Sequence, residues 1–293
     1  MFRKIVILFV LIVLAAAQAQ ESQKEKLGFV GPVKVVDVVE TVSGLEPVPT
    51  NHYEFDDSGM LLKAVVNSYD LENKLRFKIV STYENDRMVR QEKLSPTGKL
   101  ISYSEFDYDA EGNLLEQSSY TGDGTASHRR VYSYENGKVK IEDLFSGETL
   151  TRRYINEYDA DGNRIKRKRF DINGVLDQER DYNIESNSYK EVSYNSDGEI
   201  ESRAFGQLDK SGRIIKSTAY TMDGSVQTES TWNYGSTGLL EKEELVVAGD
   251  KAEYYYEYEI DEIGNWTKQT VKELLDGKYI LLETIERSFE YFK

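Results

Sequence analysis

Residues 158–170 read YDADGNRIKRKRF, in which two carboxylates and an amide surround a glycine and a basic run follows. The first half looks like part of a calcium loop. An EF-hand loop has its glycine at position 6 and an acid at position 12, whereas counting from Asp159 the glycine is fourth and the twelfth residue is Phe170. A hairpin turn accounts for the same residues, because Asp159 can accept backbone N–H groups and Gly162 can take the left-handed conformation.

Turns of this kind recur every 25 to 27 residues, and a second series is offset by about half a period. Glycine fills 15 of the 18 positions and Asp or Asn fills the others, so the repeated feature is a positive φ. The first series is Gly59, Asp86, Gly112, Gly137, Gly162, Asn187, Gly212, Gly238 and Gly264. The predicted structural turn residues among them are Gly59, Gly112, Gly162, Gly212, Gly238 and Gly264. The second series is Asn73, Gly98, Gly124, Gly147, Gly174, Gly198, Gly224, Gly249 and Gly277.

The segments between turns have the length and pattern of β-strands. About a dozen residues separate successive turns, which leaves about eight for a strand. Apolar residues alternate with polar ones, as in Leu75, Phe77 and Ile79 against Arg76 and Lys78. The sequence therefore predicts an all-β fold, a long antiparallel β-meander of about 18 strands in two-strand repeats of about 25 residues. Because twist accumulates in so wide a sheet, we expect a curled or spiralling sheet, with a β-propeller as the alternative.

The N-terminus has the features of an export signal. Arg3 and Lys4 precede an apolar run at 5–14, and Ala-Gln-Ala at 17–19 is a small-x-small cleavage pattern. The predicted organisation is a signal peptide at 1–19, an N-terminal segment leading into the sheet at 20–49, and the β-repeat domain at 50–293. The predicted location is periplasmic or secreted, without membrane insertion after signal cleavage.

Composition restricts the classes of partner. The formal net charge is −15, or −17 without the predicted signal and its two cations, which argues against nucleic acid and anionic lipid as main partners. The chain has no Cys, which excludes disulfides and thiolate chemistry. The basic run 164–169 is best explained as a solvated strand whose cations pair across the next turn with Asp177, Glu179 and Asp181. A nucleic-acid or glycan-sulfate patch is the alternative interpretation.

The repeating unit resembles that of a known family. The segments YDADGNRIKRKRF (158–170), YDAEGNLLEQSSY (108–120) and YEIDEIGNWTKQ (258–269) resemble the YD repeat of the Rhs family, and the likeness extends over most of residues 50–270. In that family the repeats build a spiralling antiparallel sheet, which in large members forms a shell around a toxin. The resemblance implies a small stand-alone exported YD-repeat protein of the Bacteroidetes type.

Aromatic residues near the C-terminus are the candidate binding residues. Tyr and Trp rings on one face of a sheet can pack against the apolar faces of sugar rings, and ordinary cross-strand packing is the alternative explanation. The possible ligand-binding aromatics are Trp232, Tyr234, Tyr256, Tyr258 and Trp266.

The sequence contains no motif for catalysis. The two histidines, His52 and His128, are not accompanied by a nucleophile motif, and we predict no catalytic, cofactor or metal-binding residues. Calcium held jointly by oxygens of neighbouring turns is the alternative cofactor prediction.

The predicted function is therefore a non-catalytic binding or scaffolding role at the cell envelope, with an envelope carbohydrate or protein as partner. The first alternative is a structural shell or adhesin-like ribbon that self-associates through its sheet edges. A cryptic hydrolase is third, because paired carboxylates are plentiful.

Overall fold

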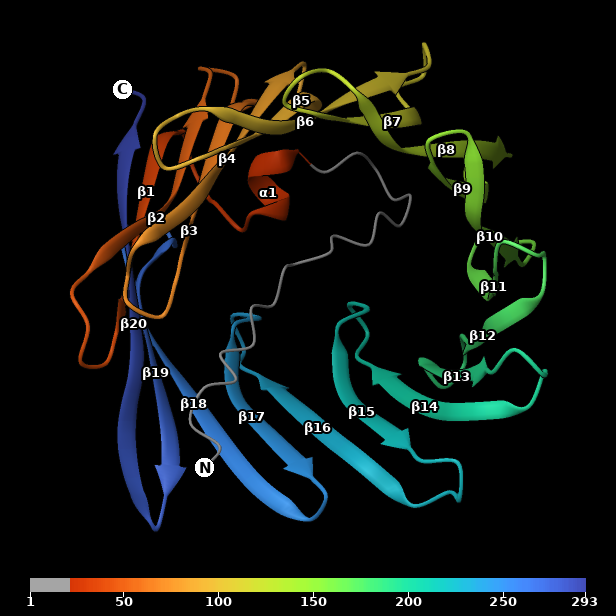
Figure 1. Cartoon of the computed structure of the whole chain (residues 1–293). Helices are drawn as coiled ribbons and strands as arrows, with labels where there is room; N and C mark the ends of the chain where they lie inside the picture. Colours follow the sequence, from red (N-terminus) through yellow and green to blue (C-terminus); the bar gives the residue numbers. More distant parts are fainter. Residues whose placement is uncertain (1–21) are drawn as a thin grey trace.

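The computed structural model describes residues 22–293, and the predicted signal peptide lies outside the described residues. A short helix, α1 (Gln23–Lys26), precedes 20 strands that form one antiparallel sheet (Figure 1). None of the helices in residues 22–293 combines the length and the apolar character needed to span a membrane. The strands are β1 (Val33–Val42), β2 (Val48–Phe55), β3 (Leu61–Tyr69), β4 (Leu75–Glu84), β5 (Arg87–Leu94), β6 (Leu100–Tyr108), β7 (Leu114–Thr121), β8 (Ala126–Glu135), β9 (Lys138–Ser146), β10 (Thr149–Tyr158), β11 (Arg164–Phe170), β12 (Leu176–Asn183), β13 (Ser188–Tyr194), β14 (Ile200–Leu208), β15 (Ile214–Tyr220), β16 (Val226–Tyr234), β17 (Leu240–Val247), β18 (Asp250–Ile260), β19 (Trp266–Leu275) and β20 (Lys278–Tyr291).

The sheet closes on itself. From β2 to β20 each strand pairs with the next, and β1 pairs with both β2 and β20, so the meander forms a barrel (Figure 1). The predicted all-β antiparallel meander is confirmed. The sheet has 20 strands where about 18 were predicted, and it closes into a barrel, which neither the predicted curled or spiralling sheet nor the alternative propeller specified.

Closure changes the interpretation of the predicted N-terminal segment. Residues 20–49 do more than lead into the sheet, because they contain β1, the strand that joins β2 to β20. Closing a barrel pairs the backbone groups that an open edge would expose. Each of the 20 strands therefore has a neighbouring strand on both sides over part of its length, and self-association through sheet edges stays a prediction.

The turns follow the predicted rule. All 18 predicted positions have a positive φ, including Asn73 at 58°, Asp86 at 61° and Gly162 at 81°. In the turn after β10, Asp159 Oδ1 accepts the backbone N–H groups of Asp161 and Asn163 at 3.0 and 2.8 Å. These bonds are the ones that the hairpin interpretation of YDADGN requires.

A plug segment, defined here as residues 22–31, identifies the inner face of the barrel. Its helix α1 lies inside the ring of strands (Figure 1), and Phe29, only 3% exposed, packs edge-on against Tyr53, Phe55 and Phe289. Because side chains alternate along a strand, Tyr53 and Phe55 mark the inward face of β2, and the strand register carries this assignment around the barrel.

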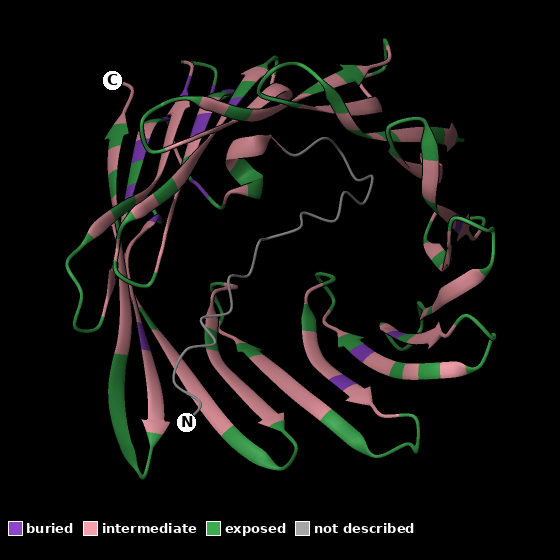
Figure 2. Ribbon diagram, in the orientation of Figure 1, coloured by how far each residue is buried: buried purple, intermediate pink, exposed green. Residues whose placement is uncertain are grey.

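Burial is concentrated at one side of the barrel. The main apolar cluster consists of Phe29, Val33, Val36, Val38, Phe55 and Leu61, all from the plug segment and β1–β3. Most residues of the other strands are neither buried nor fully exposed (Figure 2). This distribution is expected of a single-layer wall with a polar lumen, where both faces of the sheet remain partly accessible.

Candidate binding surfaces of the barrel

The outer face carries ion pairs between neighbouring strands. Lys166 Nζ lies 2.8 Å from Asp181 Oδ1, and Lys168 Nζ lies 3.9 Å from Glu179 Oε2. On the other side of the barrel Lys272 Nζ lies 2.6 Å from Glu257 Oε2. The predicted pairing of the basic run with the acids beyond Gly174 is therefore confirmed for its outward lysines.

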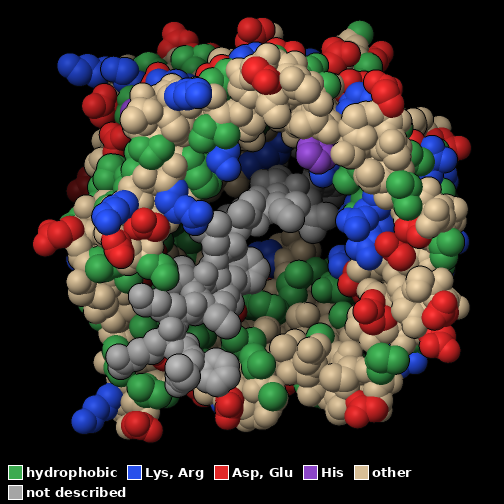
Figure 3. All heavy atoms as spheres, in the orientation of Figure 1, with side chains coloured by type: hydrophobic (Ala, Val, Ile, Leu, Met, Phe, Trp, Pro, Cys, Tyr) green, Lys and Arg blue, Asp and Glu red, His purple; other side chains and the backbone are tan. Residues whose placement is uncertain are grey.

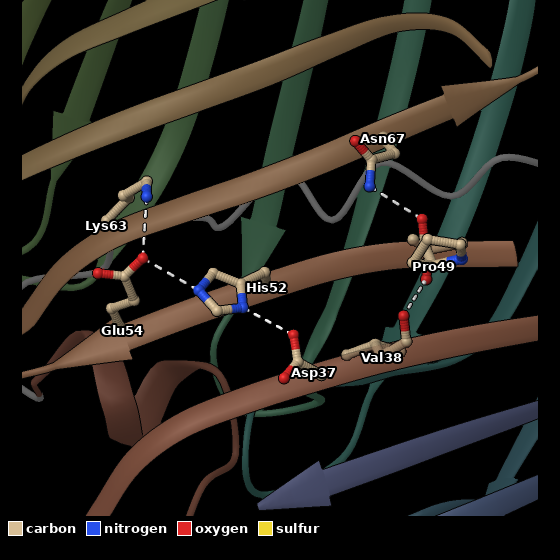
Figure 4. A network of polar contacts seen from close by, with 8 residues as sticks. Asp37, Val38, Pro49, His52, Glu54, Lys63 and Asn67 are labelled. Carbon is tan, nitrogen blue, oxygen red and sulfur yellow. Dashed lines mark hydrogen bonds and ion pairs between the residues drawn. The ribbon is translucent and has the colours of Figure 1, made fainter. Parts of the chain in front are cut away.

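A network on the outer face of β1–β3 holds the first histidine (Figure 4). His52 Nδ1 lies 2.7 Å from Asp37 Oδ1, and His52 Nε2 lies 3.0 Å from Glu54 Oε1, which also accepts from Lys63 Nζ at 2.9 Å. Partial burial opposes the charged ring, but the bonds to both carboxylates raise the pKa of His52 overall. Because each ring nitrogen faces a carboxylate, neither is placed to activate a hydroxyl nucleophile.

The predicted aromatic residues lie together on the inner face of β16, β18 and β19. We call Trp232, Tyr256, Tyr258 and Trp266 the aromatic wall. Register places Tyr256 opposite Val271 and Tyr258 opposite Gln269, both on the inward face of β19. The rings of Tyr258 and Trp266 meet edge-on with centroids 6.0 Å apart.

Polar partners accompany these rings. Tyr256 Oη donates to Glu243 Oε2 at 3.0 Å, and Gln269 Nε2 donates to Tyr258 Oη at 2.7 Å. Burial, with the nearby Glu243 carboxylate, raises the pKa of Tyr256, which therefore stays protonated and able to donate. An aromatic ring beside hydrogen-bonding groups suits the apolar face and the hydroxyl rim of a sugar.

Two of the predicted aromatics are already engaged by arginines. Arg287 Cζ lies 3.3 Å from the Trp266 ring centroid, and burial lowers the pKa of Arg287 to about 10. Tyr234 is covered by Arg213, whose Cζ lies 4.2 Å from its ring centroid. Trp232, which stands opposite Glu243 on β17, is therefore the better placed residue for contact with a ligand.

A second surface on the inner face was not predicted. We call it the arginine wall, and its members on β8, β10, β11 and β12 are Arg130, Arg152, Arg164, Arg167, Arg169 and Arg180. Register places them on one face, since Arg167 stands opposite both Asn156 and Arg180 and Arg130 stands opposite Leu144, which in turn faces Arg152. Figure 3 shows Lys and Arg side chains gathered on the wall of the central opening beside β10 and β11.

The arginine wall has more cations than carboxylates. Arg180 Nε donates to Glu191 at 2.7 Å, and Arg169 Nε donates to Asp177 at 2.7 Å. A single carboxylate, Glu142, accepts from Arg167 Nη2 at 3.0 Å and also lies 3.4 Å from Arg130 Nε. Three carboxylates thus contact four of the six guanidinium groups on this surface.

Tyrosine rings hold the guanidinium planes in place. The Cζ atoms of Arg167, Arg180 and Arg164 lie 4.2, 4.5 and 4.9 Å from the ring centroids of Tyr154, Tyr189 and Tyr182, respectively. Although burial opposes its charge, the Glu191 carboxylate raises the pKa of Arg180 overall. Stacked guanidiniums lose little side-chain freedom on binding an anion, so this surface is preorganised.

A pocket adjoins the arginine wall at β7–β10. Its volume is about 220 Å³, and its lining includes Gln117, Ser119, His128, Arg130 and Leu144. His128 stands opposite Ser119, which places it toward the lumen rather than among the outer ion pairs. It is separated from the His52 network by several strands.

The sequence contained one signal for the arginine wall. In Arg164-Ile165-Lys166-Arg167-Lys168-Arg169 the strand period of two separates the lysines from Arg167 and Arg169. The lysines point outward and the arginines inward, a sorting by residue type that the interpretation of one solvated basic run overlooked. Which of the two sets faces the lumen depends on the direction in which the barrel closes.

The turns show no arrangement of metal ligands. Within residues 22–293, no three or more His, Asp and Glu side chains are grouped so as to hold a metal ion. Hydrogen bonds from the side chain and the backbone of Asn163 lower the pKa of Asp159, which ties this carboxylate to the turn. Calcium binding by neighbouring turns stays a prediction.

Comparisons with known proteins give likenesses of shape. No family model matches the chain, and no curated protein matches it. A porin-like protein from Bacteroides uniformis has 11% sequence identity and a TM-score of 0.39 over 89% of this chain and 99% of its own. A porin-like protein from Bacteroides vulgatus has 10% identity and a TM-score of 0.32, with 88% and 99% of the two chains covered.

Proposed function

We propose that this protein is a non-catalytic binding protein, exported to the periplasm or secreted, whose barrel stands in water and holds a carbohydrate in its lumen. The observation that carries the proposal is the aromatic wall, which places Trp232, Tyr256, Tyr258 and Trp266 on the inner face of β16, β18 and β19. Rings on a rigid sheet can stack on sugar rings at a small entropic cost, since each ring has only two side-chain torsions to fix.

The outer and inner faces of the barrel carry different kinds of side chain, and this difference supports the proposal. Outward positions carry Lys–Glu and Lys–Asp pairs such as Lys272–Glu257 and Lys166–Asp181. Charged side chains on a lipid-facing strand cost up to several kcal/mol each at the middle of a bilayer, so this outer face suits water. The lumen, in contrast, combines rings with carboxylate, amide and guanidinium groups, as carbohydrate sites do.

The direct test is calorimetric titration of the mature protein with neutral and acidic hexasaccharides. Trp232→Ala removes an inward ring that stacks on no other ring or guanidinium group within residues 22–293. We expect it to weaken binding about tenfold, the loss of one stacking contact. The matched control is Tyr255→Ala, because Tyr255 lies next to Tyr256 in β18 but on the outer face of the barrel. This variant should bind the sugar as the wild type does. If no hexasaccharide binds at micromolar to millimolar concentration, the proposal is wrong.

A further inference from the structure

The lumen contains a cationic surface on a protein that is strongly acidic as a whole. The formal net charge is −15, yet the arginine wall has six guanidinium groups and only three carboxylates, Glu142, Asp177 and Glu191, which contact four of them. If this surface bound no ligand, we would expect each of its cations to pair with a nearby carboxylate, as the cations of the outer face do. The unmatched cations therefore need an explanation beyond strand pairing.

Individual polar atoms of the arginine wall are buried without partners. Within residues 22–293, Nε of Arg164, Nε of Arg167 and Oδ1 of Asn156 form no hydrogen bond although each atom is shielded from solvent. Asn156 is only 3% exposed and stands opposite Arg167. Buried polar groups left unpaired cost about 1–3 kcal/mol each, a cost that a bound polar ligand can remove.

We propose that the arginine wall is the subsite of the lumen that selects acidic oligosaccharides, those with carboxylate or sulfate groups on the sugar ring. This proposal rests on the proposed carbohydrate-binding function and names the class of sugar. Guanidinium groups recognise carboxylates and sulfates through paired N–H donors. Two of the tyrosines that stack on these arginines, Tyr154 and Tyr182, remain partly exposed and can also offer ring faces to the sugar, which a site for simple inorganic anions would not require.

The charge of the whole protein favours a sugar over a nucleic acid as the occupant. A nucleic acid carries one phosphate per nucleotide on each strand, so a long segment of it would be exposed to the acidic outer surface near the rims of the barrel. An acidic hexasaccharide is short enough to lie inside the lumen, where the unmatched arginines are. Nucleic acid therefore enters the test as a competitor.

The test compares four probes on the mature protein by calorimetry at low and moderate salt: a galacturonate hexasaccharide, a heparin-derived hexasaccharide, neutral cellohexaose and single-stranded DNA. We expect at least one acidic hexasaccharide to bind more than tenfold more tightly than cellohexaose, with an affinity that falls as salt rises. Equal affinity for cellohexaose would overturn the proposal while leaving carbohydrate binding in the lumen standing. Tighter binding of DNA would overturn it in favour of a nucleic-acid site.

Variants on one strand locate the site. Arg167→Gln keeps a donor for Glu142 but removes a charge, and we expect about a tenfold loss in affinity for the acidic hexasaccharide with cellohexaose unaffected. Lys168→Gln, the next residue on β11, removes one charge from the outer face and should leave binding unchanged. Arg152→Gln is a second variant, chosen because register places Arg152 on the lumen side and its exposed side chain contributes little to packing. Unchanged affinity in both arginine variants contradicts the proposal.

Discussion

At the scale of single residues, the fold depends on positive φ at the turns. Glycine fills 15 of the 18 positions and Asn or Asp fills the other three, and all 18 take that conformation. This much was predictable from the sequence, because the constraint is local and leaves its trace in residue type. The carboxylates around the turns accept backbone N–H groups, as Asp159 does, so their resemblance to metal ligands comes from turn chemistry.

Substitution at one turn tests this rule. Gly174 has φ +77°, and a Cβ there would meet no atom within 4 Å, so any effect of a substitution comes from the backbone conformation alone. Gly174→Ala should lower the free energy of unfolding by about 1 kcal/mol, measured by urea denaturation. Gly174→Asn should cost clearly less, because Asn occupies the equivalent position at residues 73 and 187. Equal costs for the two variants would contradict the rule.

A lumenal carboxylate makes stability depend on pH. Burial, with the nearby Glu40 carboxylate, raises the pKa of Glu283 to about 7 from 4.5. The folded state then holds a proton that the unfolded state has already released, so stability is full below pH 4.5 and falls as pH rises to about 7. Glu283→Gln should flatten this part of the stability profile in urea denaturation between pH 4.5 and 8.

The matched control for this prediction is Glu286→Gln, which removes a carboxylate from the outer face of the same strand. We expect its profile to keep the wild-type decline. The raised pKa of His52 also lowers stability as pH rises, so the difference between the two variant profiles is the quantity to compare. Identical profiles for both variants would show that Glu283 ionises freely in the folded barrel.

At the scale of elements, the plug segment is fixed to the barrel by a few specific bonds. Asn265, 1% exposed, accepts from Val30 N–H at 2.7 Å and donates to Val30 O at 2.8 Å and to Tyr291 Oη at 3.0 Å. Gln23 N–H donates to Asp86 Oδ2 at 2.6 Å. These bonds link residues that are distant in sequence, and nothing in the local pattern around Asn265 distinguished it from other turn asparagines.

Removing the Asn265 side chain should release this segment. Asn265→Ala removes both hydrogen bonds to the Val30 peptide group and the one to Tyr291, and we expect a loss of about 2 kcal/mol in urea denaturation. Hydrogen exchange of residues 22–31 should become faster at the same time. Asn233→Ala, at an exposed outer position of β16, is the control. An unchanged exchange rate in Asn265→Ala would show that the plug is held by apolar contacts alone.

Strand pairing also shows why some elements were missed. The two turn series predicted the strands between Gly59 and Gly277 from local signals. β1 was missed because it precedes the first turn of the series, and its partners β2 and β20 lie at opposite ends of the sheet. Pairing of the first and last strands depends on the twist and the number of strands in the whole sheet, so no local residue pattern can predict it.

At the scale of the whole molecule, the barrel separates two environments. The same alternation that places Lys166 and Lys168 outside places Arg167 and Arg169 inside. The predicted aromatics all point inward from β16, β18 and β19. The sequence therefore predicted their common face of the sheet, but only closure of the barrel turns that face into a lumen. The arginine wall was not predicted, because its members become one surface only when β8–β12 share an inner face.

The charged outer face predicts how the protein behaves in solution. The mature chain should remain monodisperse in buffer without detergent and should not float with neutral liposomes, because its outward ion pairs are better solvated by water than by lipid. Size-exclusion chromatography with light scattering and liposome flotation measure the two properties. A requirement for detergent, or flotation with the liposomes, would contradict the assignment of the inner and outer faces.

The central claim is that carbohydrate binds inside the barrel, against the aromatic wall. The chain has two tryptophans, both on the inner face, so Trp266→Phe leaves Trp232 as the one fluorescent indole in the lumen. Titration of this variant with the hexasaccharide that binds in calorimetry should change the emission of Trp232 saturably, with the calorimetric dissociation constant. Calorimetric binding that leaves the Trp232 emission unchanged would place the ligand elsewhere and contradict the account.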